Sequence, residues 1–454
     1  MRNLYLDAAL LPDGWAERVL LRCDARGRIA SVTSDVPCPT DAERLAGVAL
    51  PGIPNLHSHA HQRAIAGLAE RAGPDAADCF WTWRDAMYRA LAGIGPDELE
   101  AIATQLYVEM LRAGYTTVAE FHYLHHDHDG RRFADPAEMS HRLVAAARRA
   151  GIRLVLLPVL YAASGFDGGP PLAGQRRFAL DADGYAGLLQ ALRQAYGDAA
   201  DVTLGVAPHS LRAVPPPLLQ EAVALAGEAP IHLHIAEQVR EVEECRAHTG
   251  VRPVAWLLDR FAVGPRWCLV HATHMEAAET VALAETGAVA GLCPTTEANL
   301  GDGIFPAASF RAAGGRFGIG SDSHISVSPV EELRWLEYAQ RLVLRRRAVL
   351  ANGPDRPTGR SLVEAAIAGG AQACGFAASG LVPGAPADLL VLDPADPLLA
   401  GRRGDALLDA FVFAGNRPLV RQVVVGGRVV VRDGHHPNES AAAADFMATL
   451  ARIA

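Results

Sequence analysis

Short apolar runs alternate with amphipathic stretches through the middle of the chain. Eight strand-like runs end near residues 56, 120, 160, 207, 235, 270, 293 and 320. The stretches between them, such as 96–112 and 332–345, carry apolar residues at helical spacing. Eight β-α units in roughly 330 residues are typical of a (β/α)8 TIM-type barrel with insertions. We therefore predict an α/β fold with a catalytic barrel over residues 51–383.

The two ends of the chain show a different pattern, in which short apolar runs are separated by turns that contain Gly or Asp. We interpret these runs as strands, at 18–21, 28–32, 387–392, 410–413 and 421–425. Neither end can bury a sheet face alone. We therefore predict that residues 1–50 and 384–454 pair into one small β-sandwich domain.

Charge and composition exclude several functions. Lys and Arg total 42 against 51 Asp and Glu, which gives a formal net charge of −9. This balance, without a long basic block, lacks the electrostatic surface that nucleic-acid binding requires. All the basic residues are arginine, because the sequence contains no lysine. Schiff-base and pyridoxal-phosphate catalysis, Walker A phosphate loops and a carbamylated lysine between two metals are therefore excluded.

The cysteines and the apolar runs predict the cellular compartment of the protein. The cysteines are scattered and contain no C-x-x-C pair, which favours buried thiols in a reducing compartment over disulfides or a thiolate zinc site. They are Cys23, Cys38, Cys79, Cys245, Cys268, Cys293 and Cys374. No apolar run approaches about 18 residues, and Asp7 and Pro12 interrupt the first run, so we expect no membrane span and no signal peptide. We expect a cytoplasmic protein.

Side chains of catalytic type follow four of the predicted strands. They are His57-Ser58-His59, His232-Leu233-His234 with Glu237, His271-Ala272-Thr273-His274, and Ser321-Asp322. Alone, an H-x-H pair is often a surface or core pair, and Ser-Asp after a strand often caps a helix. In a barrel, however, the carboxyl ends of the strands meet on one face. Three imidazoles and a carboxylate there suit Zn²⁺, so the set together favours a metal-dependent hydrolase.

These motifs carry a resemblance to a known family. The first reads P-G-x-x-N-x-H-x-H from Pro51, and H-x-x-E, His and Ser-Asp follow the fifth, sixth and eighth strands. The combination resembles the amidohydrolase superfamily over almost the whole chain. One branch of that superfamily holds two metals through a lysine carbamate on strand four. This chain has His209 there and no lysine, so it resembles the one-metal deaminase branch.

The resemblance implies roles for individual residues. It implies one divalent metal ion, with Zn²⁺ expected, held by His57, His59, His234 and Asp322. It implies that the catalytic residues are Glu237, His271 and Asp322. His232 is expected to lie in the core or to contact a metal ligand without binding the metal itself.

Further segments narrow the resemblance to one family within this superfamily. They are H-A-H-Q-R-A from His59, F-W-T-W-R from Phe80, A-E-F-H-Y from Ala119, H-S-L-R from His209 and T-E-A-N-L-G from Thr296. Together they resemble the formimidoylglutamate deiminase family. This resemblance implies hydrolysis of N-formimino-L-glutamate to N-formyl-L-glutamate and ammonia in histidine degradation. It implies substrate contacts from Gln62, Arg84, Tyr123, His209 and Arg212. Arginine suits a dicarboxylate, because its planar guanidinium pairs with a carboxylate through two hydrogen bonds.

Two alternatives remain open. A related deaminase that acts on a purine or another heterocycle would need an aromatic stacking wall and amide groups rather than paired arginines. A catalytically inactive barrel that serves as a binding protein would be expected to have lost ligands, and none is missing here. The expected partner is a small dicarboxylate substrate rather than nucleic acid or a membrane. The resemblance also suggests a homodimer, although the sequence reveals no interface.

Overall fold

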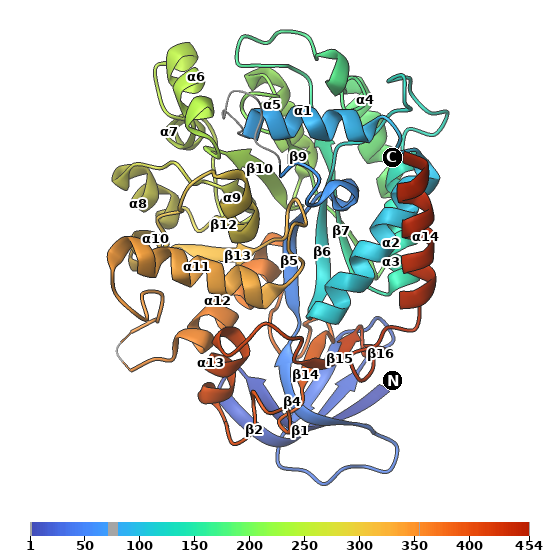
Figure 1. Cartoon of the computed structure of the whole chain (residues 1–454), viewed down its shortest axis with the longest axis vertical. Coiled ribbons are helices and arrows are strands. Elements are labelled where there is room, and N and C mark those ends of the chain that lie inside the picture. The colour runs from blue at the N-terminus through green and yellow to red at the C-terminus, as the bar shows by residue number, and fades with distance from the viewer. Residues whose placement is uncertain (1, 71–79, 354, 454) are drawn as a thin grey trace.

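The computed structural model describes residues 2–70, 80–353 and 355–453. All eight predicted runs form parallel strands, which lie in two sheets (Figure 1). One sheet has the order β5-β6-β7-β8 with β9 beside β7, and the other has the order β10-β11-β12-β13. The bounds are β5 (Ile53–Ser58), β6 (Tyr115–His122), β7 (Arg153–Leu160), β8 (Val202–Leu204), β9 (Ala207–Pro208), β10 (Ile231–Ile235), β11 (Trp267–His271), β12 (Val289–Leu292) and β13 (Arg316–Ile319).

The fourth run is divided, because the backbone passes very close to its neighbours between β8 and β9. A Cβ at Gly205 would lie 2.5 Å from Cδ2 of Leu157 and 2.9 Å from the carbonyl oxygen of Pro230, so only glycine fits here. The next residue, Val206, forms an isolated parallel bridge with Ile231 of β10. This bridge links the two parallel sheets.

A second bridge links the two parallel sheets along their other edges. Ser58 of β5 forms an isolated parallel bridge with Asp322, just after β13. A Cβ at Gly320 would lie 2.8 Å from Cβ of His57, so a glycine is needed for this approach. The first and last parallel strands are therefore held together where two of the predicted metal ligands lie.

Helices lie around the parallel strands (Figure 1). The stretches predicted as helical at 96–112 and 332–345 form α2 and α11. α2 has Pro96 in its first turn and ends at Gly114 in the left-handed conformation. The bounds are α1 (Phe80–Leu91), α2 (Pro96–Ala113), α3 (Glu138–Ala150), α4 (Ala182–Tyr196), α5 (Pro216–Ala226), α6 (Val239–Thr249), α7 (Pro253–Arg260), α8 (Ala277–Glu285), α9 (Pro294–Leu300), α10 (Ala307–Ala312), α11 (Pro329–Leu344) and α12 (Thr358–Ala373).

The two ends of the chain pair, as predicted, into one sheet with the order β16-β15-β14-β4-β1-β2-β3. β14 pairs antiparallel with β4, which joins the C-terminal strands to the N-terminal ones. Among the described residues, the strands of the two chain ends all belong to this single sheet, so the second layer of a β-sandwich stays a prediction. The bounds are β1 (Arg2–Leu11), β2 (Gly14–Cys23), β3 (Ile29–Thr33), β4 (Glu43–Pro51), β14 (Leu389–Leu392), β15 (Val420–Val425) and β16 (Arg428–Val431).

The prediction of a strand at residues 410–413 is wrong. These residues end α13 (Asp405–Phe413), which packs against α11 and α12. A short apolar run fits either kind of element, and here burial against two helices decides in favour of a helix. The last helix, α14 (Glu439–Ile453), packs against α2. The C-terminal segment therefore contacts the parallel-strand unit as well as the small sheet.

A buried ion pair also joins these two parts. Arg153, at the start of β7, donates to both carboxylate oxygens of Asp388 at 2.9 and 3.1 Å. The cysteines of the described residues are all free, and all except Cys38 are buried. Cys79 lies outside the described residues. Within the same ranges, every helix is too short or too polar to cross a membrane.

Candidate metal centre and substrate pocket

The four predicted metal ligands meet at one point. His57 lies in β5, His59 follows that strand, His234 lies in β10 and Asp322 follows β13. The Nε2 atom of His57 is 3.2 Å from Nε2 of His59 and 2.9 Å from Nε2 of His234. The Oδ1 atom of Asp322 lies 3.3 Å from Nε2 of His59 and 3.5 Å from Nε2 of His57. All four side chains are buried, and one donor atom from each lies within 4.8 Å of the others.

Hydrogen bonds turn the imidazole lone pairs toward this point. The Nδ1–H of His59 donates to the carbonyl of Phe121 at 2.9 Å, and the Nδ1–H of His234 donates to that of His209 at 3.1 Å. Both rings therefore present Nε2 as an acceptor. Burial lowers the pKa of His57, His59 and His234, so the three rings are neutral. Lone pairs that face one another repel unless a cation lies between them, so the arrangement fits a divalent metal.

A buried carboxylate holds the backbone on both sides of His59. Glu120 accepts hydrogen bonds from Oγ of Ser58 at 2.5 Å and from the backbone N–H of Ala60 at 2.6 Å. The hydroxyl of Tyr107 donates to the same carboxylate at 3.2 Å. Burial raises the pKa of Glu120 to about 7. This side chain fixes where His59 leaves the strand.

Several residues at the strand ends have left-handed backbone conformations that non-glycine residues rarely adopt. Their φ angles are 50° for Ala236, 68° for His271 and 46° for Asp322. Each such residue costs about 1–3 kcal/mol unless its surroundings hold it, and such residues concentrate at functional sites. The backbone at the ends of β10, β11 and β13 is therefore specialised to orient side chains toward this centre.

Glu237 and His271 lie beside the ligands. The Nε2 atom of His271 is 3.7 Å from Oε1 of Glu237 and 3.7 Å from Oδ2 of Asp322, and its Nδ1 is 3.2 Å from Oε1 of Glu297. Burial alone would lower the pKa of His271, but these carboxylates raise it well above its usual value. Burial raises the pKa of Glu237 to about 7. A carboxyl group with this pKa both accepts and donates a proton near neutral pH.

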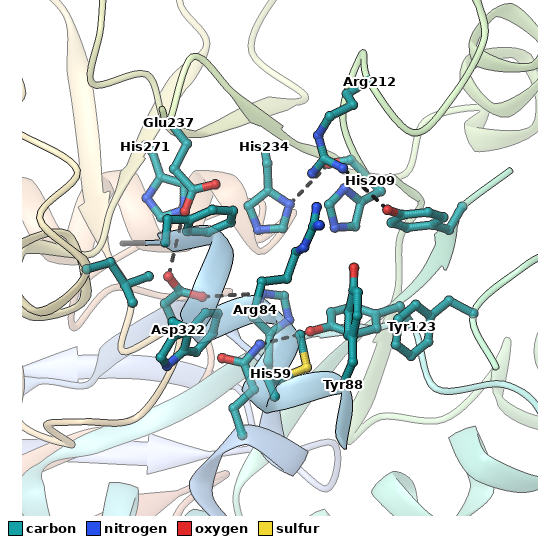
Figure 2. Close-up of a pocket in the computed structure, with 17 residues that line it drawn as sticks. His59, Arg84, Tyr88, Tyr123, His209, Arg212, His234, Glu237, His271 and Asp322 are labelled. Atoms are coloured by element: carbon teal, nitrogen blue, oxygen red, sulfur yellow. Dashed lines mark hydrogen bonds and ion pairs between the residues drawn. The ribbon is translucent and has the colours of Figure 1, made fainter. Parts of the chain in front are cut away.

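The five predicted substrate contacts line one pocket together with three of the four predicted metal ligands, His59, His234 and Asp322. Glu237 and Asp322 lie on one side of it, Arg212 and Tyr123 lie on the other, and Arg84 lies between them (Figure 2). The structure thus brings together residues from widely separated parts of the chain, namely Gln62, Arg84, Tyr123, His209 and Arg212.

Arg212 is a buried cation that faces this pocket. Its Nη1 donates to the hydroxyl of Tyr161 at 3.4 Å, and its guanidinium lies 5.7 Å from the centroid of the Trp81 ring. Only 8% of Arg212 is exposed, and in the described part of the chain no carboxylate oxygen lies within 4.0 Å of it. Burial alone would lower the pKa of Arg212, but Tyr161, Tyr88 and Glu241 raise it. A buried charge without a partner is costly, so this position suits an anionic ligand.

The other polar groups of the pocket are held by aromatic and amide neighbours. The guanidinium of Arg84 lies 4.7 Å from the ring centroid of Trp81 and 5.4 Å from that of Tyr88, both on α1. These are favourable cation–π distances. The side-chain amide of Gln62 donates to the hydroxyl of Tyr123 at 2.8 Å.

His209 and His232, which are not among the predicted metal ligands, differ in their surroundings. Burial and the nearby Arg212 lower the pKa of His209 well below its usual value, so the ring lines the pocket in its neutral form. His232 lies in the core, where its Nε2 donates to the carbonyl of Ala373 at 2.8 Å. Burial lowers the pKa of His232 to about 4.

Sequence reasoning missed several residues that shape the site. Glu120 and Glu297 lie within segments that carried the resemblance, but a linear pattern does not reveal which N–H groups or imidazoles they contact. Tyr88 and Tyr161 lie outside those segments, and only their positions in the pocket show that they face the two arginines.

Comparison with known proteins shows the family of this chain. Residues 48–430 match the model of the amidohydrolase family, and the chain belongs to this family. It is similar to a formimidoylglutamate deiminase from Pseudomonas aeruginosa, with 55% identity and coverage of 100% of both chains. A solved amidohydrolase from Brucella melitensis is 49% identical, has a TM-score of 0.95 and is also matched over 100% of both chains. A 5-methylthioadenosine/S-adenosylhomocysteine deaminase from Halobacterium salinarum is 31% identical over 91% of this chain and 88% of its own length.

Proposed function

We propose that this protein hydrolyses N-formimino-L-glutamate to N-formyl-L-glutamate and ammonia, a step of histidine degradation, with one bound divalent metal ion. The observation that carries the proposal is the position of Arg212. This buried guanidinium, without a carboxylate partner among the described residues, lines the same pocket as three of the four converging ligand side chains, namely His59, His234 and Asp322. Such a pocket suits a small substrate with a hydrolysable carbon–nitrogen bond at one end and carboxylates at the other. The full-length identity of 55% to a formimidoylglutamate deiminase supports the same reaction.

His57, His59, His234 and Asp322 would hold the metal ion. Three neutral imidazole nitrogens and one carboxylate oxygen are donors that Zn²⁺ prefers, so zinc is the expected metal. The chain has no lysine that carbon dioxide could convert into a bridging ligand, which supports a single ion. When bound, the ion supplies a water molecule that is acidic enough to act as a nucleophile near neutral pH.

Three side chains would hold or move protons during the reaction. Asp322 takes a proton from the attacking water. Glu237, with a pKa of about 7, carries a proton to the departing nitrogen. Protonated His271 donates a hydrogen bond to the attacking oxygen as negative charge develops on it. The bond to the terminal nitrogen breaks, ammonia leaves, and the formyl group remains on the nitrogen of glutamate.

The arginines would bind the carboxylates of the substrate. Arg212 lies on the side of the pocket away from Glu237 and His271, with Arg84 between them, and this separation matches that between the formimino group and the carboxylates (Figure 2). Neutral groups complete the pocket and would donate or accept single hydrogen bonds, namely Gln62, Tyr123 and His209. Neutral His209 beside Arg212 adds no further positive charge.

The fold proposed for this function is a closed (β/α)8 barrel with a small second domain. The bridges of Ser58 with Asp322 and of Val206 with Ile231 support closure, because they join the two parallel sheets along both edges. We assign residues 51–383 to the catalytic barrel, and residues 1–50 with 384–454 to the small domain. Closure would place the ends of all eight strands, and thus all the proposed ligands, on one face.

A direct test combines metal analysis with an assay of ammonia release. The purified protein should hold one equivalent of zinc and release ammonia from N-formimino-L-glutamate. Guanine and adenosine serve as comparison substrates, because a heterocycle deaminase would act on one of them instead. Ammonia from a purine but not from N-formimino-L-glutamate would refute the proposed substrate. A protein without stoichiometric metal and without turnover would be an inactive barrel.

A further inference from the structure

Glu241, in the first turn of α6, holds the backbone that carries Glu237. Its Oε1 accepts a hydrogen bond from the N–H of Ala236 at 3.1 Å, and its Oε2 accepts one from the N–H of Glu237 at 2.9 Å. Ala236 has a φ angle of 50°, so the chain turns sharply between His234 and Glu237. A single carboxylate therefore satisfies both N–H groups of this strained turn.

Glu241 also lies close to the pocket arginine. Only 5% of Glu241 is exposed. Burial raises the pKa of this carboxyl group, whereas the positive charge of Arg212 and the two backbone donors lower it. Glu241 therefore interacts electrostatically with the group proposed to bind a substrate carboxylate and holds the backbone of the group proposed to carry the proton. It does not line the pocket itself.

We propose that Glu241 is a positioning residue, which acts on the reaction by fixing the orientation of Glu237 relative to His271 and the substrate. This inference rests on the proposed function. The reasoning is geometric: a proton carrier must lie within hydrogen-bond reach of two atoms in turn, and a misplacement of about 1 Å can reduce the rate about 100-fold. Glu241 holds the backbone of Glu237 and thereby the point from which the Glu237 side chain reaches into the pocket.

The test is the substitution Glu241→Gln, which keeps the shape of the side chain. Glutamine has one acceptor oxygen, so one of the two N–H groups would face the amide NH₂, which is also a donor. A matched control is Glu279→Gln. Glu279 is similarly buried and accepts two backbone N–H groups, from Glu276 at 2.9 Å and Ala255 at 3.1 Å, but neither of these residues is a proposed catalytic group.

We expect Glu241→Gln to reduce kcat by about 10- to 100-fold with a smaller change in KM and with the bound zinc retained. Glu279→Gln should leave kcat within about threefold, even if it lowers the melting temperature, because its carboxylate holds the backbone of no proposed catalytic residue. Equal kcat losses in the two variants would mean that Glu241 only stabilises the fold. Loss of zinc from Glu241→Gln would mean that it supports the metal ligands instead of Glu237.

A double-mutant cycle with Glu237→Gln makes the inference sharper. If Glu241 acts through Glu237, then Glu241→Gln should change kcat by less than about threefold in the Glu237→Gln background. The same fold-loss in both backgrounds would overturn the inference. The two proposals fail separately. If the wild type turns over N-formimino-L-glutamate and Glu241→Gln has the same kcat, only the positioning role is refuted. Wild-type turnover of a purine alone refutes the substrate, and the same cycle on that purine then decides the role of Glu241.

Discussion

The substitution Arg212→Met tests whether the buried guanidinium binds a carboxylate of the substrate. Methionine keeps much of the apolar stem but removes all five N–H donors and the charge. In the free protein the loss is small, since the one hydrogen bond of the guanidinium within the described residues is the long contact of 3.4 Å to the hydroxyl of Tyr161. The main effect should therefore appear when substrate binds.

The size of this effect follows from the burial of the site. A hydrogen bond to a charged group contributes about 1.5–3 kcal/mol. In the variant, the substrate carboxylate would lose its water on entering the pocket and find no cation in return. Since each 1.4 kcal/mol corresponds to about tenfold, kcat/KM should fall by roughly 10- to 150-fold or more.

The assay measures ammonia release from N-formimino-L-glutamate and from its two monoamides. Zinc content should not change, because Arg212 is not a ligand. The loss caused by Arg212→Met should shrink for the monoamide that lacks the carboxylate bound by Arg212. Arg240→Met is a matched control: the Arg240 guanidinium also lies over the Trp81 ring, at 4.6 Å, but it is exposed and paired with Glu244. That variant should remain within about threefold of wild type.

Two results would refute the reasoning. Equal losses for the dicarboxylate and for both monoamides would mean that Arg212 shapes the pocket without reading the charge of the substrate. Equal losses in Arg212→Met and Arg240→Met would mean that contact with Trp81, rather than carboxylate binding, is what matters.

Three further predictions concern the metal, the proton carrier and the fold. His234→Ala should remove the single bound zinc and abolish turnover; two equivalents of tightly bound catalytic zinc in the wild type would contradict the one-metal centre. Glu237→Gln should keep zinc and fold but reduce kcat by about 10²–10⁴, and near-normal activity would assign the proton transfer to another group. Asp388→Ala should lower the free energy of unfolding in urea by about 3–5 kcal/mol, because it leaves Arg153 buried without its partner. Asp201→Ala breaks the more exposed pair of Asp201 with Arg148 and should lower the free energy of unfolding by about 1 kcal/mol or less. Equal losses in the Asp388 and Asp201 variants would contradict the burial argument.

The strands and helices of the middle of the chain could be predicted because their patterns are local. The runs near residues 160 and 235 form β7 and β10, and the stretch at 96–112 forms α2. The strand predicted at 410–413 is a helix, because an apolar run of four residues fits both elements until its neighbours are known. The division between β8 and β9 depends on how closely Gly205 approaches Pro230, which no local pattern reveals.

The candidate site was predictable to the extent that its residues belong to sequence motifs. His57 and His59 stand two residues apart, and Glu237 stands three residues after His234; these motifs at the ends of barrel strands together indicated a shared chemistry, and the family resemblance implied the individual roles. Glu120 lies within a motif segment, but neither its spacing nor that of Glu241 reveals what the side chain contacts. Glu241 accepts two backbone N–H groups, and Glu120 accepts one backbone N–H and two hydroxyl groups. Any buried glutamate in a sequence could make such contacts.

The sequence by itself determined the element types in the middle of the chain, the donor atoms available for a metal and, through the absence of lysine, the chemistries that this protein cannot use. The tertiary structure alone decided that the Nε2 atom of His59 and the carboxylate of Asp322 lie 3.3 Å apart. It also decided that Arg212 is buried without a carboxylate partner in the described part of the chain. The physical reason is that hydrogen bonding and desolvation depend on distances and solvent exposure between segments far apart along the chain. Those distances exist only once the strands have packed side by side.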